Sequence, residues 1–299
     1  MHTRVVVATV AAVLGTAAPL LSPAPGARAG EVGKAVKAGK VTAPTVVAHR
    51  GASAYAPENT LASIDKAATL GFTWVENDVQ RTKDGELVVI HDDSLPRTTN
   101  VKTVFPGRAP WKVKDFTAAE IARLDAGRWF SPAYAGTRVP TLKQYMRRVE
   151  HNHESLLMEI KNPELYPGIE RQTLKLVGDE GWLDRGHLRR IIVQSFSADS
   201  VRKVHELRPA ITTAFLGTPT VAQLHEYARS IDLVNPAYQS LSLGYVSAVH
   251  AFDGPHGKPL RVFAWTVNDT ATARKVAGYR VDGVITNKPD VVRAALGSG

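Results

Sequence analysis

From residue 45 onward, short runs of aliphatic residues alternate with longer stretches in which apolar residues recur at helical spacing. Most of these runs are not broken by polar residues, which is typical of strands buried on both faces. Between most of them lie segments such as residues 59–71, where Asn59 or Thr60 can begin a helix and Gly71 can end it. This order predicts a parallel sheet covered by helices. The predicted strands are residues 45–49, 73–79, 86–91, 156–160, 190–196, 211–216, 231–235, 260–267 and 282–286.

The chain has 299 residues, which is compatible with one α/β barrel as well as with two smaller domains. Nine strands are predicted, so a barrel of eight strands would leave one of them misplaced, and residues 73–91 are the ambiguous part. The segment "RTKDGE" within them is too short for a helix that connects parallel strands. Residues 92–140 show no clear strand alternation, so we expect an insertion over one end of the barrel. Its aromatic residues, which predict a small apolar cluster of its own, are Phe105, Trp111, Phe116, Trp129, Phe130 and Tyr134.

The first residues have the pattern of an export signal. Arg4 precedes an apolar run, and Ala27-Arg28-Ala29 matches a cleavage site with small residues. A membrane anchor is the alternative, but Gly and Pro interrupt the run before it reaches the roughly 20 apolar residues of a span. We therefore predict a signal peptide over residues 1–29, cleaved after about Ala29, and secretion of the protein. Residues 30–44 are predicted to be a flexible leader, and residues 45–299 the folded domain.

Composition narrows the possible chemistry. The chain has no cysteine, which excludes disulfides, thiol nucleophiles and thiolate metal sites. Its formal net charge of +9 favours anionic partners such as phosphate esters or phospholipid surfaces. The basic residues are scattered and form no stripe with aromatic residues, so nucleic acid is not the expected partner. Membrane contact is expected to be at most peripheral.

Polar residues gather where the predicted strands end. His49 and Arg50 end the first strand, and Glu76 and Asp78 project from one face of the second, because side chains alternate along a strand. His91 ends the third. The fourth ends with two more such residues, Glu159 and Lys161. If the strands are parallel, all of these side chains meet at one mouth of the barrel.

The carboxylates of this set predict a metal site. Glu76 and Asp78 have apolar flanks, and two carboxylates about 4 Å apart repel by roughly 4 kcal/mol at an effective dielectric constant near 20. Either one is protonated or a cation lies between them. With Glu159 the site has only oxygen ligands, which suits Mg²⁺ or Ca²⁺. Arg50 and Lys161 can offset the remaining negative charge and attract a phosphate.

Several motifs together make the chain recognisable. They are "AHRGASAYAPENT", "WVENDVQRTKDGELVVIHDD" followed by "RTT", "EIK", "QSF", "AWTVN" and "DGVITNKPD". In this order the chain resembles the glycerophosphodiester phosphodiesterases over nearly all of its predicted mature length. The resemblance implies an irregular TIM (β/α)8 barrel with an insertion after the third strand, and metal-dependent hydrolysis of a small glycerophosphodiester to sn-glycerol 3-phosphate and an alcohol.

The resemblance also implies roles for single residues. His49 would be the general base and His91 the general acid, an order that spacing alone does not establish. Glu76, Asp78 and Glu159 would bind Ca²⁺ or Mg²⁺, and Arg50 and Lys161 would contact the phosphate. Trp265, in "AWTVN", is expected to line the substrate pocket. Both direct attack by water and a route through a cyclic phosphate are compatible with this set.

The chain departs from the family pattern at three positions. Asn77 stands between the two carboxylates where an aliphatic residue is usual, so a buried amide needs partners. Pro96 replaces a common acidic residue, and Asn287 stands where Asp often occurs. We expect these changes to affect loop shape and substrate choice more than the chemistry.

Two rival functions remain at this point. One is a sphingomyelinase D-like phospholipase acting on lyso- or sphingophospholipids, in which the third ligand is usually Asp, whereas this chain has Glu159. The other is a non-catalytic secreted module that binds phosphate polymers. Such a module would tolerate the loss of a histidine or a ligand, and this chain has lost none.

Overall fold

The computed structural model describes residues 43–297. The predicted signal peptide, residues 1–29, and most of the predicted leader, residues 30–44, lie outside this range. Among the described residues, no helix is both long enough and apolar enough to cross a membrane.

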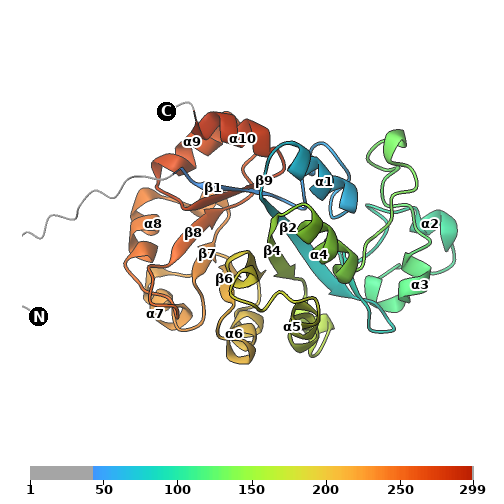
Figure 1. The fold of residues 1–299 in the computed structure, drawn as a ribbon, viewed down its shortest axis with the longest axis horizontal. Helices are drawn as coiled ribbons and strands as arrows, with labels where there is room; N and C mark the ends of the chain where they lie inside the picture. Colours follow the sequence, from blue (N-terminus) through green and yellow to red (C-terminus); the bar gives the residue numbers. More distant parts are fainter. Residues whose placement is uncertain (1–42, 298–299) are drawn as a thin grey trace, which may run out of the picture. The chain divides into compact units, whose positions relative to one another are not determined.

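Eight parallel strands close into a barrel, because β1 pairs with both β2 and β9. This confirms the predicted TIM barrel, with helices on the outside of the strands (Figure 1). The strands of the ring are β1 (Thr45–Ala48), β2 (Trp74–Arg81), β4 (Ser155–Ile160), β5 (Ile191–Ser195), β6 (Thr212–Leu216), β7 (Leu233–Asn235), β8 (Arg261–Ala264) and β9 (Gly283–Thr286). The helices that follow them are α1 (Leu61–Thr69), α4 (Leu142–His151), α5 (Ile169–Asp179), α6 (Ala198–Leu207), α7 (Leu224–Tyr227), α8 (Leu243–His250), α9 (Thr270–Gly278) and α10 (Pro289–Leu296).

The remaining strand, β3 (Leu87–Val89), lies outside the ring and runs antiparallel to β2. All nine predicted strands therefore exist, and none is misplaced. The expectation that His91 ends a third parallel strand is wrong. The short turn before β3 contains Gly85 with φ +92°, and a link of this length can only reverse the chain.

Residues 92–140 carry only short helices. These are α2 (Val101–Val104), η1 (Val113–Asp115), α3 (Ala118–Ile121) and η2 (Pro132–Tyr134). Buried residues between and within these helices form the predicted apolar cluster, which includes Leu95, Phe116 and Leu124 and extends to Val88 and Ile90 at the hairpin. Of the six aromatic residues expected in it, three belong to it, whereas Trp129, Phe130 and Tyr134 pack edge-on against one another outside it. In Figure 1 these helices lie together at the right of the view, away from α7 and α8. The insertion thus packs on the β2–β3 hairpin.

Local sequence signals set the helix ends as predicted. The Oγ1 of Thr60 accepts a hydrogen bond from the backbone N–H of Ser63 and begins α1, and Gly71 follows the helix with φ +75°.

Inside the ring, one apolar side chain from each of seven strands fills the barrel. They are Val47, Leu157, Ile192, Ala214, Leu233, Phe263 and Ile285. These packed side chains lie beneath the site at the barrel mouth, and Ile285 lines its cavity.

Candidate active site

The predicted site residues come together in one cavity of about 60 Å³. Asp78 alone of them does not line it and is fully buried beside Glu76 and Glu159. The lining residues are His49, Arg50, Glu76, His91, Glu159, Lys161, Gln194, Phe196, Leu216, Trp265, Thr266 and Ile285. The grouping expected from the ends of the strands is therefore present, although β3 runs in the other direction.

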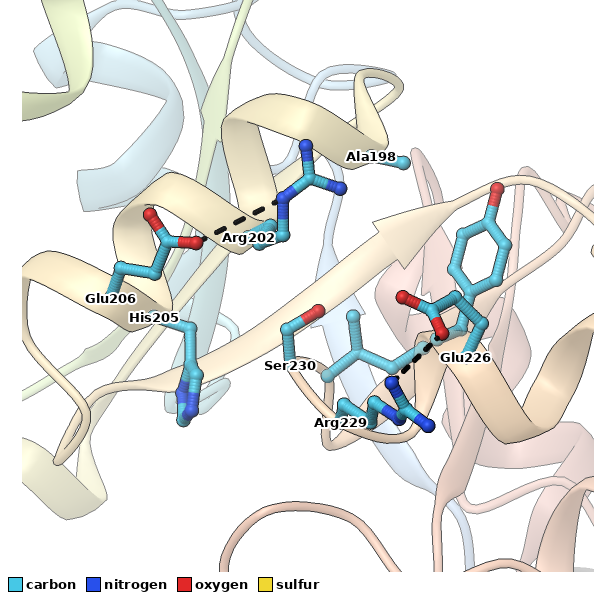
Figure 2. A pocket seen from close by; sticks show the side chains of 9 residues that line it. Ala198, Arg202, His205, Glu206, Glu226, Arg229 and Ser230 are labelled. Atoms are coloured by element: carbon cyan, nitrogen blue, oxygen red, sulfur yellow. Dashed lines mark ion pairs between the residues drawn. The ribbon is translucent and has the colours of Figure 1, made fainter.

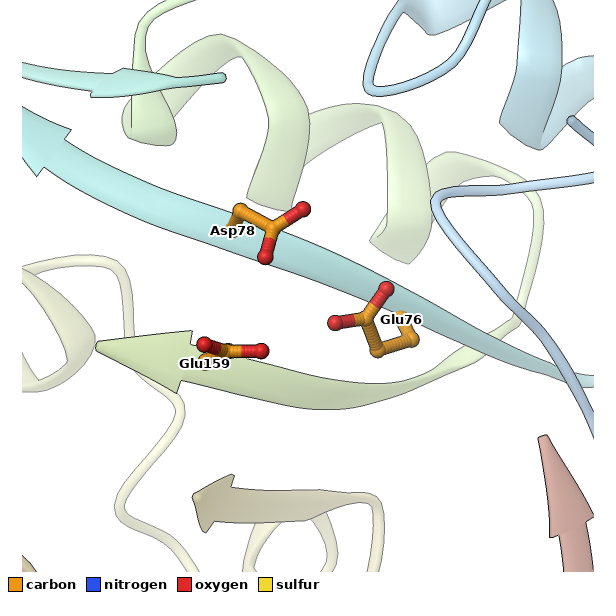
Figure 3. Close-up of side chains that lie close together, drawn as sticks. All are labelled: Glu76, Asp78 and Glu159. Carbon is orange, nitrogen blue, oxygen red and sulfur yellow. The ribbon is translucent and has the colours of Figure 1, made fainter. Parts of the chain in front are cut away.

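Glu76, Asp78 and Glu159 form a buried carboxylate cluster, shown in Figure 3. One oxygen from each lies within 4.8 Å of the others. The strands explain this placement, since alternation puts Glu76 and Asp78 on one face of β2, and the register of β2 with β4 pairs Asp78 with Glu159. The donor set consists only of carboxylate oxygens.

The cluster is electrostatically costly without a cation. Burial, followed by the charges of Asp78 and Glu159, raises the pKa of Glu76 well above its usual range. Burial, together with the charge of Asp78, raises the pKa of Glu159 to about 8. The Oδ1 of Asp78 is buried and accepts no hydrogen bond from any described residue. A buried carboxylate oxygen without a donor, between two other carboxylates, is suited to a divalent cation.

Two cationic side chains face the cluster. The Nε of Arg50 lies 3.4 Å from the Oδ2 of Asp78. The Nζ of Lys161 lies 2.7 Å from the Oε1 of Glu159 and 3.7 Å from Asp78. Burial opposes ionisation of Asp78, but the positive charges of Arg50 and Lys161 hold its pKa below the usual value. These cations border the same cavity, where a phosphate would meet positive charge.

A strained turn positions the first two site residues. Arg50 has φ +56° and Gly51 has φ +77°, which turns the chain sharply after β1. The backbone N–H of Arg50 then donates to Glu76 Oε2 at 2.9 Å. At Gly51 a Cβ would lie 2.6 Å from the backbone carbon of Ser63, so the start of α1 can pack against this turn only if the residue is glycine.

His49 is held by an amide. Its Nδ1 lies 2.7 Å from the Oδ1 of Asn287. The backbone N–H of Asn287 donates to the Oδ1 of Asn268. Because an amide oxygen only accepts, Nδ1 carries the proton and Nε2 is left with a lone pair. That Nε2 lies 4.0 Å from Glu76 Oε2. Burial, and then the charge of Arg50, lowers the pKa of His49 to about 4, so the ring is neutral near pH 7.

His91 is held by a carboxylate. The β2–β3 hairpin brings it back beside Asp78, whose carbonyl accepts a hydrogen bond from the N–H of Ile90. Its Nδ1 lies 2.7 Å from the Oδ1 of Asp92. Burial, together with the positive charges of Arg50 and Lys161, lowers the pKa of His91, and the charge of Asp78 and the hydrogen bond to Asp92 oppose that shift. The two histidines thus face one cavity with different partners behind them.

An aromatic pair lines another part of the cavity. The indole N–H of Trp265 donates to the carbonyl of Asn235 at 2.7 Å, which fixes the ring at the mouth as predicted. Phe196, 51% exposed, packs edge-on against it with ring centres 5.6 Å apart.

Sequence reasoning assigned no role to several residues that contact this set. The Nε2 of Gln194 donates a long hydrogen bond of 3.5 Å to Glu76, and the Oε1 of Gln194 accepts one from Asn235 at 2.8 Å. Three charged side chains, Glu58, Asp92 and Arg97, lie behind His91 and Arg50 and are joined to them by hydrogen bonds. All of them occur in the motifs "QSF", "PENT", "HDD" and "RTT", which were used only to recognise the family.

A larger groove lies elsewhere, between α6 and α7 (Figure 2). It has a volume of about 420 Å³ and is lined by Arg202, His205 and Glu226 among others. The two ion pairs drawn in Figure 2 join residues that are close in sequence, one pair within α6 and the other between α7 and the turn after it, and neither crosses the groove. The groove occurs where α7 is only four residues long, and none of the predicted site residues lines it.

Comparison with known proteins identifies the family of the chain. The family described as "Glycerophosphoryl diester phosphodiesterase family" matches residues 49–291. The chain belongs to this family. It is therefore an enzyme, a phosphodiesterase of the glycerophosphodiester class.

Its relatives cover nearly the same length. A glycerophosphodiester phosphodiesterase of Bacillus subtilis is 36% identical over 261 residues, which is 82% of this chain and 84% of that protein. One from Caldanaerobacter subterraneus is 34% identical over 257 residues, 83% of this chain and 95% of that protein. Among solved structures, an Oleispira antarctica phosphodiesterase in complex with the product sn-glycerol-3-phosphate has a TM-score of 0.74 and 28% identity. The alignment covers 86% of this chain and 98% of that one.

Proposed function

We propose that the protein hydrolyses small glycerophosphodiesters to sn-glycerol 3-phosphate and an alcohol, with His49 as general base and His91 as general acid. The observation that carries this proposal is the arrangement of the two rings, each held at Nδ1 from behind, on a cavity that is also lined by two carboxylates of the cluster and by two cations. The product named for the Oleispira antarctica structure supports the substrate class.

The different partners of the histidines support the order of their roles. Asn287 is neutral and leaves His49 with a free lone pair on Nε2, as a general base requires. Asp92 is negative and opposes the lowering of the pKa of His91, so it favours the doubly protonated ring that a general acid needs in order to give a proton from Nε2. His49 would take the proton of the attacking hydroxyl, either water or the glycerol hydroxyl of the substrate. His91 would give a proton to the alkoxide when its P–O bond breaks.

Glu76, Asp78 and Glu159 would hold one Ca²⁺ or Mg²⁺ ion. When bound, such an ion supplies positive charge against the phosphoryl oxygens, which become more negative in the transition state. Arg50 and Lys161 would orient the phosphate from the same side. The walls formed by Trp265 and Phe196 would contact the carbon atoms of the substrate. We further propose that the protein acts after export, on the basis of residues 1–29.

Phosphorus NMR of glycerophosphocholine turnover tests the proposal. The protein is first stripped with chelator and then assayed with and without added Ca²⁺ or Mg²⁺. We expect sn-glycerol 3-phosphate only with added ion, and with any cyclic phosphate only transient. Glu159→Gln should weaken ion binding measured by calorimetry, whereas Glu164→Gln, at an exposed position, should not.

Other outcomes would contradict specific parts. Full activity in protein shown by elemental analysis to be metal-free would exclude the cation. Faster turnover of lysophosphatidylcholine or sphingomyelin, with a cyclic phosphate as the end product, would favour the sphingomyelinase D-like function. Tight binding of phosphodiesters without any turnover would favour the non-catalytic module.

A further inference from the structure

A chain of alternating acidic and basic side chains connects His91 to Arg50 behind the cavity. Asp92 accepts from His91 Nδ1 at 2.7 Å, and Arg97 donates to Asp92 from Nε at 2.6 Å and from Nη2 at 3.0 Å. Arg97 also donates to both oxygens of Glu58, at 2.9 and 2.7 Å. Glu58 in turn accepts from Nη1 of Arg50 at 2.9 Å. The chain therefore begins at one proposed active-site residue and ends at another.

We propose that Asp92, Arg97 and Glu58 are positioning residues that fix the His91 ring and the Arg50 guanidinium relative to each other. This inference rests on the proposed function for its consequence in catalysis, although the contacts themselves do not depend on it. None of the three lines the cavity. They would act through His91 and Arg50 and not on the substrate.

The chemistry of the contacts supports positioning. A carboxylate can only accept, so Asp92 keeps the proton of neutral His91 on Nδ1 and turns Nε2 away from itself. Arg97 presents a planar set of donors to two carboxylates at once, a geometry that a lysine ammonium cannot reproduce. The oxygens of Asp92 therefore cannot rotate freely behind His91.

Stability alone gives little reason for this arrangement. The side chain of Arg97 is 44% exposed, and exposed ion pairs usually contribute less than about 1 kcal/mol to stability. Yet this arginine contacts two carboxylates through four hydrogen bonds. Burial opposes ionisation of Asp92, but hydrogen bonds from Arg97 and His91 lower its pKa to about 2. The carboxylate therefore stays charged at neutral pH.

Two of the three residues come from the start of the insertion, and Glu58 comes from the loop between β1 and α1. The chain of contacts thus joins the loop that carries Arg50 to the segment that follows His91. It gives the first residues of the insertion a function at the site, apart from the apolar cluster that the rest of the insertion forms.

A neighbouring residue provides a matched control. Asp93 has the same side chain at the next position. Its Oδ2 lies 2.6 Å from the Nζ of Lys112, as close as Asp92 lies to Arg97, but Lys112 belongs to the insertion and not to the chain of contacts behind His91. We expect Asp92→Asn to lower kcat for glycerophosphocholine by at least about tenfold with little change in KM, because an amide can hold an imidazole in the wrong tautomer. Asp93→Asn should stay within about twofold of the unmodified enzyme.

Substitutions of Arg97 test whether it acts through Asp92. Arg97→Met should lower kcat, Arg97→Lys should restore part of it, and the double variant Asp92→Asn with Arg97→Met should be no slower than Asp92→Asn alone. A purely structural role would instead make the losses add.

Nitrogen-15 NMR of histidine-labelled protein gives a readout independent of turnover. Neutral His91 should carry its proton on Nδ1, should gain the Nε2 tautomer in Asp92→Asn, and should be unchanged in Asp93→Asn. If Asp92→Asn leaves the tautomer unchanged, or if both aspartate variants lose kcat equally, the inference is wrong. If the unmodified protein hydrolyses no glycerophosphodiester but the tautomer still shifts in Asp92→Asn alone, the positioning stands and the proposed function fails.

Discussion

At the residue scale, His49 and His91 differ mainly in the group that holds Nδ1. Asn287 contributes no charge, whereas Asp92 contributes a negative one. An acidic residue in place of Asn287 would put a negative charge beside His49, as Asp92 does beside His91, and would favour a proton on His49. The departure from the family pattern therefore increases the difference between the two rings, and their roles can be separated by experiment.

Leaving-group dependence measures which histidine is the acid. His49→Ala and His91→Ala should each lower kcat for glycerophosphocholine by at least about a hundredfold. With a p-nitrophenyl ester of glycerol 3-phosphate, whose leaving group needs no proton, His91→Ala should recover most of the loss and His49→Ala should not. His225→Ala, at an exposed position on α7, is the control. Recovery in His49→Ala instead would reverse the two roles.

Asn77 is a second informative residue. Its side chain is fully buried, and neither its Nδ2 nor its Oδ1 has a hydrogen-bond partner among the described residues. Val75 and Val79, on the same face of β2, belong to the apolar core beneath the helices. The expected partners of this amide are not present among the described residues, and we expect Asn77 to reduce stability.

Asn77→Val should therefore stabilise the protein. Removing an unsatisfied buried amide is expected to raise the free energy of unfolding by about 1–3 kcal/mol, or Tm by about 2 °C or more. Calorimetry and denaturant unfolding measure this change, and kcat should stay within about twofold because the side chain points away from the cavity. Asn100→Val, which loses a hydrogen bond to the N–H of Asp125, should destabilise. A destabilised Asn77→Val protein would mean that the amide has a partner.

At the scale of elements, the turn between β1 and α1 determines where His49 and Arg50 lie. Gly51 is necessary there for its positive φ and for the space it leaves to Ser63. Gly85 in the β2–β3 turn also has a positive φ, but a Cβ at that position would meet nothing within 4 Å. Alanine at each of these two positions therefore distinguishes the cost of a positive φ, which both share, from the cost of a steric clash, which only Gly51 would have.

Gly85→Ala should cost only the strain, about 1–2 kcal/mol of unfolding free energy. Gly51→Ala should cost more and should also lower kcat/KM, because the turn must shift and carry Arg50 with it. Denaturant unfolding and steady-state kinetics on both variants measure the difference. Equal losses of stability, with kcat/KM unchanged in both, would show that the turn adapts without moving the site.

At the scale of the whole molecule, the barrel also buries a carboxylate that belongs to no described site. Glu154 precedes β4, at the end of the barrel opposite the mouth, and is 1% exposed. Burial and the charge of Asp65 raise its pKa from 4.5 to about 8, although Asn152 donates a hydrogen bond to it. The folded state therefore favours the protonated form.

This shift makes stability depend on pH. The unfolded chain ionises Glu154 near pH 4.5 and the folded protein only near pH 8, so its contribution to stability falls as pH rises between these values and is constant above them. Glu154→Gln should match the unmodified protein near pH 4.5 and should be more stable by at least about 1 kcal/mol at pH 8.5. Denaturant unfolding across pH measures the difference, and Glu164→Gln is the exposed control. A difference that does not change with pH would show that Glu154 is not buried as a neutral acid.

The sequence by itself determined the strands, the helix that begins at Thr60, the insertion, and the histidines, charged residues and Trp265 that line the cavity. It did not predict Gln194 or Phe196 there. Hydrophobic periodicity and capping are local signals, and alternation along β2 already puts Glu76 and Asp78 on one face. The end of the fourth predicted strand added Glu159 and Lys161, and the motif "AWTVN" added Trp265. These predictions needed no knowledge of which segments lie side by side.

Only the tertiary structure decided the partners of the two histidines and the place of β3 outside the ring, although the short link before β3 already excluded a parallel crossover. Asn287 is 238 residues from His49, and Glu58 is 39 residues from Arg97. No local pattern links such pairs, because a hydrogen bond between distant residues depends on how strands and loops pack. The same reason explains Asn77 and Glu154, whose side chains are polar in the sequence but lie where the fold supplies too few partners.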